Sequence, residues 1–262
     1  MLKKWLLVGA ITATASGGLA HKAEAYQAYP RRYVSRPLLL PPSTIRFDAA
    51  FPLLSVDPPA ADRLNTFSAL IGVGLGLTPN LEIGGVLLPL QLTEEFDYRN
   101  PSFYGLYRLL TTEVLDLGLR ADVSIPAQDA REPFNGAVTP FLPWCGDLAV
   151  GIPMRLRFFD AVLLDSGAHL GFVFTDPVGT LITVPLKVAI QVTDTVFLGP
   201  QTGIQVVNGD DAVIPAGLFL GANFGSSSEP MLDLVGSFLL PDANDGFDAF
   251  VVGLGLNLYL FL

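Results

Sequence analysis

Five basic side chains and three carboxylates recur at alternate positions in the middle of this sequence. The basic residues are Arg108, Arg120, Arg155, Arg157 and Lys187, and the acidic residues are Asp116, Asp122 and Asp165. In an extended chain alternate residues point to one face, so all eight share a face. Cations that line one wall of a pore favour anions, whereas cations paired with neighbouring carboxylates fill the space between them. The sequence leaves both arrangements open.

A single histidine, His169, lies on the same face as Asp165 once the first 25 residues are set aside. Nucleophilic catalysis needs a hydroxyl or thiol within reach of such a base, but Ser166 points to the opposite face. We therefore expect no enzyme, and an inward His169 that packs against its neighbours, with a pH-sensitive gate as the alternative. The only cysteine, Cys145, has no disulfide partner, and we expect no metal site and no cofactor.

The elements that carry these residues alternate with a period of two. Twelve segments share this pattern: 44–54, 66–77, 81–92, 102–110, 113–125, 147–158, 161–174, 180–193, 196–207, 212–224, 231–240 and 249–262. They are longer than the usual strand of a soluble protein, about 5–6 residues, and match the roughly 9–11 residues of a tilted transmembrane strand. The alternation breaks around Gly84 and Gly85, where we expect a bulge.

The last segment shows which face meets which solvent. Leucines occupy positions 254, 256, 258, 260 and 262, with small and polar residues between them. A soluble sandwich would expose that second face to water, where Lys, Glu and Thr are usual. Glycine and isolated charges instead suit the concave interior of a closed barrel. We therefore expect the leucine stripes to face lipid.

The connections alternate in length. Those after the second, fourth, sixth, eighth and tenth segments are tight, whereas the others are mostly longer and acidic. Repeated Gly and Pro exclude transmembrane helices. The predicted fold is all-β: a single closed antiparallel transmembrane β-barrel of about 12 strands, with short periplasmic turns and longer acidic extracellular loops.

The beginning of the chain indicates its destination. Residues 1–25 combine a basic start, an apolar core and Ala23-Glu24-Ala25, which predicts a cleaved signal peptide. Removing Lys3, Lys4, Lys22 and Glu24 from 15 basic and 25 acidic residues leaves 12 and 24, a net charge of −12. Residues 26–43 form a leader rich in Pro, Arg and Tyr. This leader either hangs free in the periplasm, or it tucks into the mouth of a barrel that spans 44–262 or touches a periplasmic partner.

Residues 44–262, with GLTPNLEIGG and the final GLGLNLYLFL, resemble bacterial outer-membrane β-barrel proteins of the porin-like kind. The resemblance implies the outer membrane of a Gram-negative bacterium, with lipids, lipopolysaccharide and the barrel-assembly machinery as partners. In that class the last residue is usually an aromatic that the machinery reads. Phe261 is penultimate here, on the inward parity, so the phase of the last strand departs from the pattern.

Two functions remain from the sequence. The first is a small porin-like channel or transporter for small solutes, with the basic residues, Asp116, Asp122, Asp165 and His169 lining the lumen. The second is a non-conducting structural or surface-interaction barrel whose lumen is filled by side chains. No basic surface points to nucleic acid.

Overall fold

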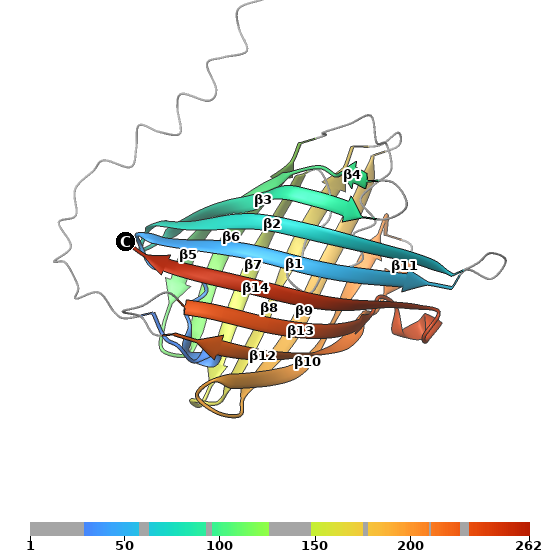
Figure 1. The fold of residues 1–262 in the computed structure, drawn as a ribbon. Helices are drawn as coiled ribbons and strands as arrows, with labels where there is room; N and C mark the ends of the chain where they lie inside the picture. The colour runs from blue at the N-terminus through green and yellow to red at the C-terminus, as the bar shows by residue number, and fades with distance from the viewer. Residues whose placement is uncertain are drawn as a thin grey trace, which may run out of the picture.

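The chain forms a closed β-barrel in the computed structural model, which describes residues 29–57, 63–92, 96–125, 148–174, 178–209, 211–225 and 231–262. Within these residues, twelve long strands form one antiparallel sheet (Figure 1). Strand β14 pairs with β1, and β9 pairs with β10, so the sheet has no free long edge. The predicted fold class, an all-β closed antiparallel barrel of 12 strands, is confirmed.

The strands agree closely with the alternating segments. The twelve are β1 (Thr44–Val56), β2 (Leu64–Thr78), β3 (Leu81–Leu92), β5 (Ser102–Thr111), β6 (Leu115–Ser124), β7 (Leu148–Phe158), β8 (Val162–Val173), β9 (Gly179–Gln191), β10 (Val196–Val207), β12 (Ala216–Phe224), β13 (Met231–Leu240) and β14 (Ala249–Phe261). Two short strands, β4 (Phe96–Tyr98) and β11 (Asp211–Val213), extend the edges of β3 and β10.

Two local expectations differ from the structure. The register of β2 against β3 shifts between Ile71 opposite Leu88 and Gly72 opposite Val86, which makes Leu87 the extra residue. The bulge therefore follows the Gly84-Gly85 pair rather than lying at it. Strand β12 begins at Ala216 instead of 212, directly after Pro215, which has no N–H to donate to a ladder.

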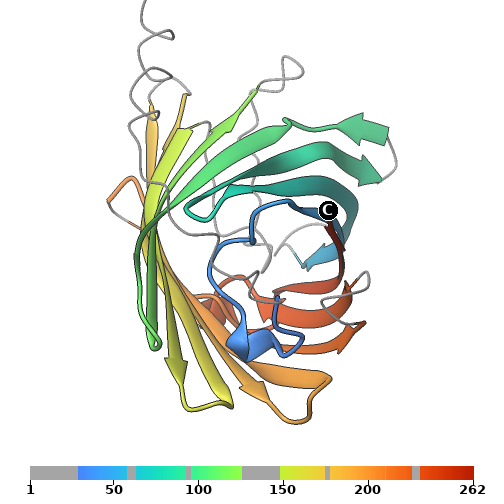
Figure 2. The ribbon, with the colours of Figure 1, turned by 90° about the vertical axis from the view of Figure 1, so that its left-hand side faces the viewer.

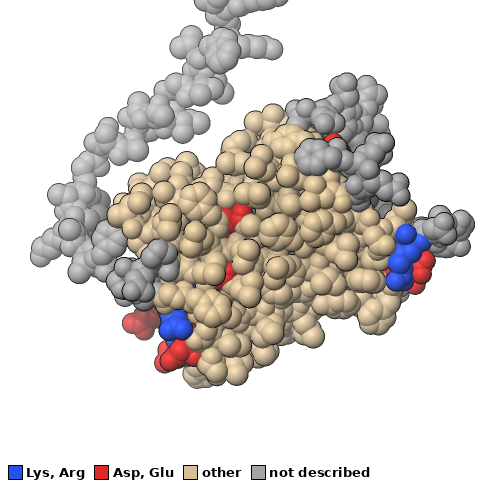
Figure 3. Space-filling view, viewed as in Figure 1, with Lys and Arg blue, Asp and Glu red and all other residues tan. Residues whose placement is uncertain are grey.

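The two faces of the barrel wall differ as the alternation predicts. In β14, Leu254 is 45% exposed and Leu258 is also exposed, whereas Val251 and Tyr259 are buried inside. Figure 3 shows an outer face that is almost wholly uncharged between charged ends, with only small acidic patches between them. This is the surface that hydrocarbon requires, because it carries its apolar side chains outward.

A charge on this face gives the first prediction. Leu254→Arg places a guanidinium near the middle of a strand, and at the bilayer midplane such a change costs about 2–4 kcal/mol. In phospholipid vesicles titrated with urea, we expect this variant to unfold at a lower urea concentration than the parent protein. The folded fraction at each urea concentration is measured on a gel, where folded barrels run differently from heat-unfolded ones. Leu262→Arg is the matched control, since position 262 lies beyond the end of β14 and costs near an interface are small. Equal losses in both variants would contradict a lipid-facing stripe.

The two ends of the barrel differ in their connections. The turns after β2, β5, β7 and β9 are short and lie at the same end as the C-terminus (Figure 1). Two one-turn 3₁₀ helices are present among the described residues, η1 (Tyr33–Ser35) and η2 (Ala243–Asp245). No helix in the described part of the chain is long and apolar enough to cross a membrane.

Candidate functional site: the lumen and its strap

Residues 29–43, called the strap below, lie inside the barrel at the end that carries the tight turns (Figure 2). Tyr29, Val34, Leu39 and Leu40 are all buried there. The sequence left open whether this segment hangs free or enters the barrel mouth, and the described residues have the second arrangement. Residues 26–28 and the expected signal peptide lie outside the described part of the chain.

The strap contains the single 3₁₀ turn η1 and no strand, and four of its residues are prolines, which interrupt α-helices and ladders. Its backbone groups therefore need partners from the barrel wall. The N–H of Leu38 donates to Asp116 over 3.0 Å, and the N–H of Leu40 donates to Glu82 over 2.8 Å. Two carboxylates of the barrel wall thus accept hydrogen bonds from the backbone of the strap.

The barrel wall carries a glycine where the strap contacts it. A Cβ atom at Gly76 of β2 would overlap the carbonyl oxygen of Pro41. Next to it, the N–H of Ser43 donates to the Gly76 carbonyl over 2.8 Å, where the strap turns into β1. Only glycine permits this close approach of two backbones.

Arg36 anchors the strap most firmly. Two nitrogens of its guanidinium donate hydrogen bonds to the carboxylate of Asp233, and both residues are 1% exposed. The ring of Tyr259 lies 5.1 Å from the guanidinium carbon and that of Tyr29 lies 5.2 Å away. A buried cation with a bidentate carboxylate and aromatic neighbours is held in a single orientation.

The protonation of this cluster follows from its burial. Burial alone lowers the pKa of Arg36, but Tyr259, Tyr29 and the hydrogen-bonded Asp233 outweigh it, so the pKa is raised. Burial also raises the pKa of the Tyr29 hydroxyl, which nearby Arg36 opposes in part. The guanidinium is therefore charged and the phenol neutral at all physiological pH values.

Three of the five basic residues singled out in the sequence have carboxylate partners. Arg120 pairs with Asp122, Arg155 with Asp165 and Arg157 with Asp116. Arg155 and Arg157 also donate to the strap: the carbonyl of Arg36 accepts from both, and that of Pro37 accepts from Arg155 over 2.8 Å. All six side chains face the interior, where they act in pairs and as contacts to the strap.

The other three singled-out residues have different surroundings. The ammonium of Lys187 lies 4.2 Å from the ring centre of Phe219 and 5.2 Å from that of Tyr33. The backbone N–H of Arg108 donates to Asn80, and its buried Nε has no hydrogen-bond partner among the described residues. His169 is buried, and its ring lies so close over the backbone of β7 that a Cβ at Gly151 would overlap it.

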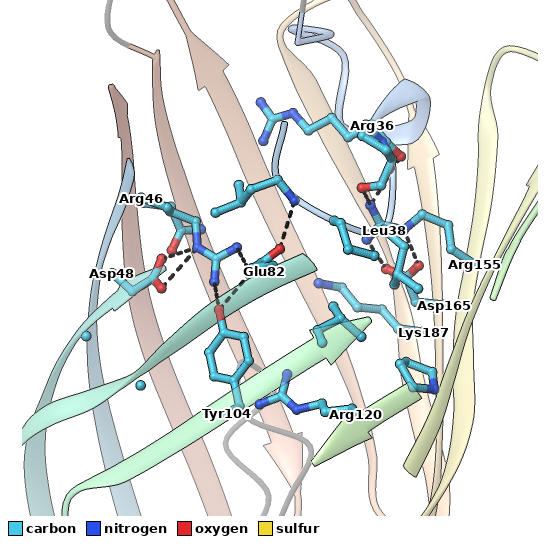
Figure 4. A pocket seen from close by; sticks show the side chains of 18 of the residues that line it. Arg36, Leu38, Arg46, Asp48, Glu82, Tyr104, Arg120, Arg155, Asp165 and Lys187 are labelled. Atoms are coloured by element: carbon cyan, nitrogen blue, oxygen red, sulfur yellow. Dashed lines mark hydrogen bonds and ion pairs between the residues drawn. The ribbon is translucent and has the colours of Figure 1, made fainter. Parts of the chain in front are cut away.

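A second polar cluster, which was not singled out from the sequence, lies across the lumen from Arg155, Asp165 and Lys187 (Figure 4). Arg46 donates to Asp48 over 2.8 Å and to the Tyr104 hydroxyl over 3.1 Å. That hydroxyl donates to Glu82 over 2.7 Å. The inward parity of these residues follows from the same alternation, but no local pattern indicates that they meet.

Between the clusters lies a cavity of about 340 Å³. Its lining includes the strap from Arg36 to Leu40, Arg46 and Tyr104 on one side, and Arg155 and Lys187 on another (Figure 4). Both cations and carboxylates therefore border a space large enough for a small solute. Among the described residues, no group of three His, Cys, Asp or Glu side chains is arranged to hold a metal ion. Cys145 lies outside the described residues.

Comparisons with known proteins support the fold. No family model matches the chain, and no curated protein matches it by sequence. It is similar to the solved structure of an outer membrane channel from Pseudomonas putida F1, with a TM-score of 0.54 and 11% identity over 84% of this chain and 97% of the other. It is also similar to the NanC porin (TM-score 0.52, 7% identity, 80% and 98%) and to the KdgM porin in complex with disordered oligogalacturonate (0.50, 7%, 83% and 99%). At these identities the shared property is the outer-membrane barrel fold.

Proposed function

We propose that this chain is a channel of the bacterial outer membrane that passes small polar solutes through the lumen, with the strap forming its narrowest part. The observation that supports this most directly is the cavity of about 340 Å³ inside the closed barrel, bordered by charged side chains and by a strap that is held non-covalently. A barrel that served only as a scaffold needs no such polar space. We propose no enzymatic activity.

The setting of the channel is proposed with it. The apolar outer face is suited to lipid, and the acidic residues of the long connections are suited to the cell-surface side, close to lipopolysaccharide. The barrel-assembly machinery is the expected partner during insertion. The signal peptide over residues 1–25 belongs to the same proposal, because a barrel of this kind has to leave the cytoplasm before it inserts.

The alternative is a non-conducting barrel, and one observation favours it. The strap lies in the mouth at the tight-turn end (Figure 2), and the Arg155–Asp165 and Arg157–Asp116 pairs lie against it. Single-channel recording in planar bilayers separates the two functions. Stepwise currents from the purified mature protein would support the channel, and their absence across many insertions would support the structural barrel.

The pairing of charges leads to a prediction about ion selectivity. Because carboxylates offset three of the five cations, we expect only a slight preference between anions and cations in the reversal potential under a KCl gradient. Asp165→Asn leaves Arg155 without its carboxylate, and we expect the reversal potential to move toward anions. Asp160→Asn is the control, since it makes the same change of charge at an exposed turn. An unchanged potential in Asp165→Asn would show that ions do not pass this wall.

A further inference from the structure

The site that Arg36 occupies is built by the barrel wall. Asp233, Asn223 and Tyr259 lie on the adjacent strands β13, β12 and β14. Asn223 Nδ2 donates to one carboxylate oxygen of Asp233 over 2.7 Å, and the Tyr259 hydroxyl donates to the other over 3.0 Å. These two wall donors orient the carboxylate without any help from the strap. We call these three residues the Asp233 socket.

The socket also contains a buried oxygen atom that can accept a hydrogen bond from a ligand. Asn223 is 0% exposed, and its Oδ1 has no hydrogen-bond partner among the described residues. A buried amide oxygen normally accepts a hydrogen bond. The socket therefore offers a carboxylate, a phenol and a free acceptor together, which suits a ligand that is positively charged and has several N–H donors.

Arg36 uses only some of the groups that the socket offers. Two of its nitrogens bind Asp233, but Nε donates to the Pro30 carbonyl over 3.0 Å and Nη2 also donates to the Arg31 carbonyl over 3.0 Å. Those two carbonyls belong to the strap. The wall itself recognises the planar fork of the guanidinium and nothing of the rest of Arg36.

We propose that the Asp233 socket is a guanidinium-binding site of the lumen, which Arg36 fills in this structure and which a solute with a guanidinium group takes when the strap leaves. A guanidinium fits better than an ammonium because its fork matches a carboxylate in a bidentate manner and its flat face suits the Tyr259 ring. Arg36 and Tyr259 also line the lumen cavity, so the socket borders the space that a solute would enter.

The strap and such a solute exclude each other. A ligand that binds only the strap-free protein shifts the population toward it. Guanidinium solutes therefore favour the arrangement in which the strap is withdrawn. This consequence for transport rests on the proposed channel, whereas binding to the socket does not.

The test uses methylguanidinium chloride at millimolar concentration, far below denaturing levels, with the Arg36→Ala variant of the mature protein in detergent. We expect saturable binding by calorimetry, at least about tenfold tighter than to the Arg36→Ala/Asp233→Asn double variant, because the charged partner is lost there. Methylammonium at equal ionic strength should bind more weakly. Equal binding to both variants, or none to Arg36→Ala, would overturn the proposal.

A second measurement covers the case in which Arg36→Ala does not fold. In the unaltered protein, methylguanidinium should speed trypsin cleavage after Arg32, next to the buried Val34, and methylammonium should not. Equal rates with the two cations would reject the socket. Binding without any bilayer current would leave the socket standing and reject the channel, whereas current without binding would reject the socket alone.

Discussion

A barrel that begins at Ser43, and so lacks the strap, should conduct severalfold more current per channel than the mature protein. The strap lies within the mouth at the tight-turn end (Figure 2), and Tyr29, Val34, Arg36, Leu39 and Leu40 are buried there. Ion flow through a water-filled pore increases with its open cross-section. Removing the narrowest part therefore raises the single-channel conductance, which is measured in planar bilayers with both proteins refolded in the same detergent.

The selectivity of the shortened barrel should change as well, and its sign follows from the charges removed. The strap carries Arg31, Arg32 and Arg36 and no acidic residue. Its loss also uncovers Glu82, Asp116 and Asp233, which serve strap groups in the intact protein. The lumen becomes more negative, so the reversal potential under a KCl gradient should move toward cations.

A matched control keeps the strap in place. Arg31→Ala removes an exposed hydrogen bond to Thr195 and leaves the Arg36 anchor intact. Its conductance should match that of the mature protein. If the Ser43 barrel also matches it, the strap does not limit the flow and the narrowest part lies elsewhere.

The barrel was predictable from the sequence because the information for it is local. Each strand encodes its two faces by alternation, so that Leu254 and Val251 are assigned outward and inward without knowledge of any other strand. Tight turns then fix which strands are neighbours and in which register. Even so, the Leu87 bulge and the start of β12 at Ala216 depend on neighbouring strands, and they were misplaced by a few residues.

The interior was less predictable because its contacts are distant in sequence. Arg36 and Asp233 are 197 residues apart, and nothing in either local pattern indicates the other. The four prolines of the strap disfavour an α-helix or a strand there, but they do not say where the segment lies. Parity placed Arg155 and Asp165 on one face, yet only the strand pairing makes Asp165 the residue opposite Arg155.

Asp233→Ala should release the strap while leaving the barrel folded. The change leaves Arg36 as a buried cation without its carboxylate, and breaking a buried pair in this way costs about 3–5 kcal/mol. This unfavourable state is avoided if the strap leaves the mouth, because Arg36 is then exposed to water. The strap-open population should then rise about a hundredfold or more, and the single-channel conductance should increase.

Limited trypsin digestion measures this release, because the bond after Arg32 lies beside the buried Val34 and is cut only when the strap opens. Asp57→Ala removes one member of the exposed pair with Arg63 and is the control, with almost no change expected. The double variant Arg36→Met/Asp233→Met replaces the ion pair with apolar groups and should restore slow cleavage, since such replacements are often neutral. Fast cleavage in the double variant would show that the strap is held by specific recognition of the guanidinium rather than by the avoidance of a buried, unpaired charge.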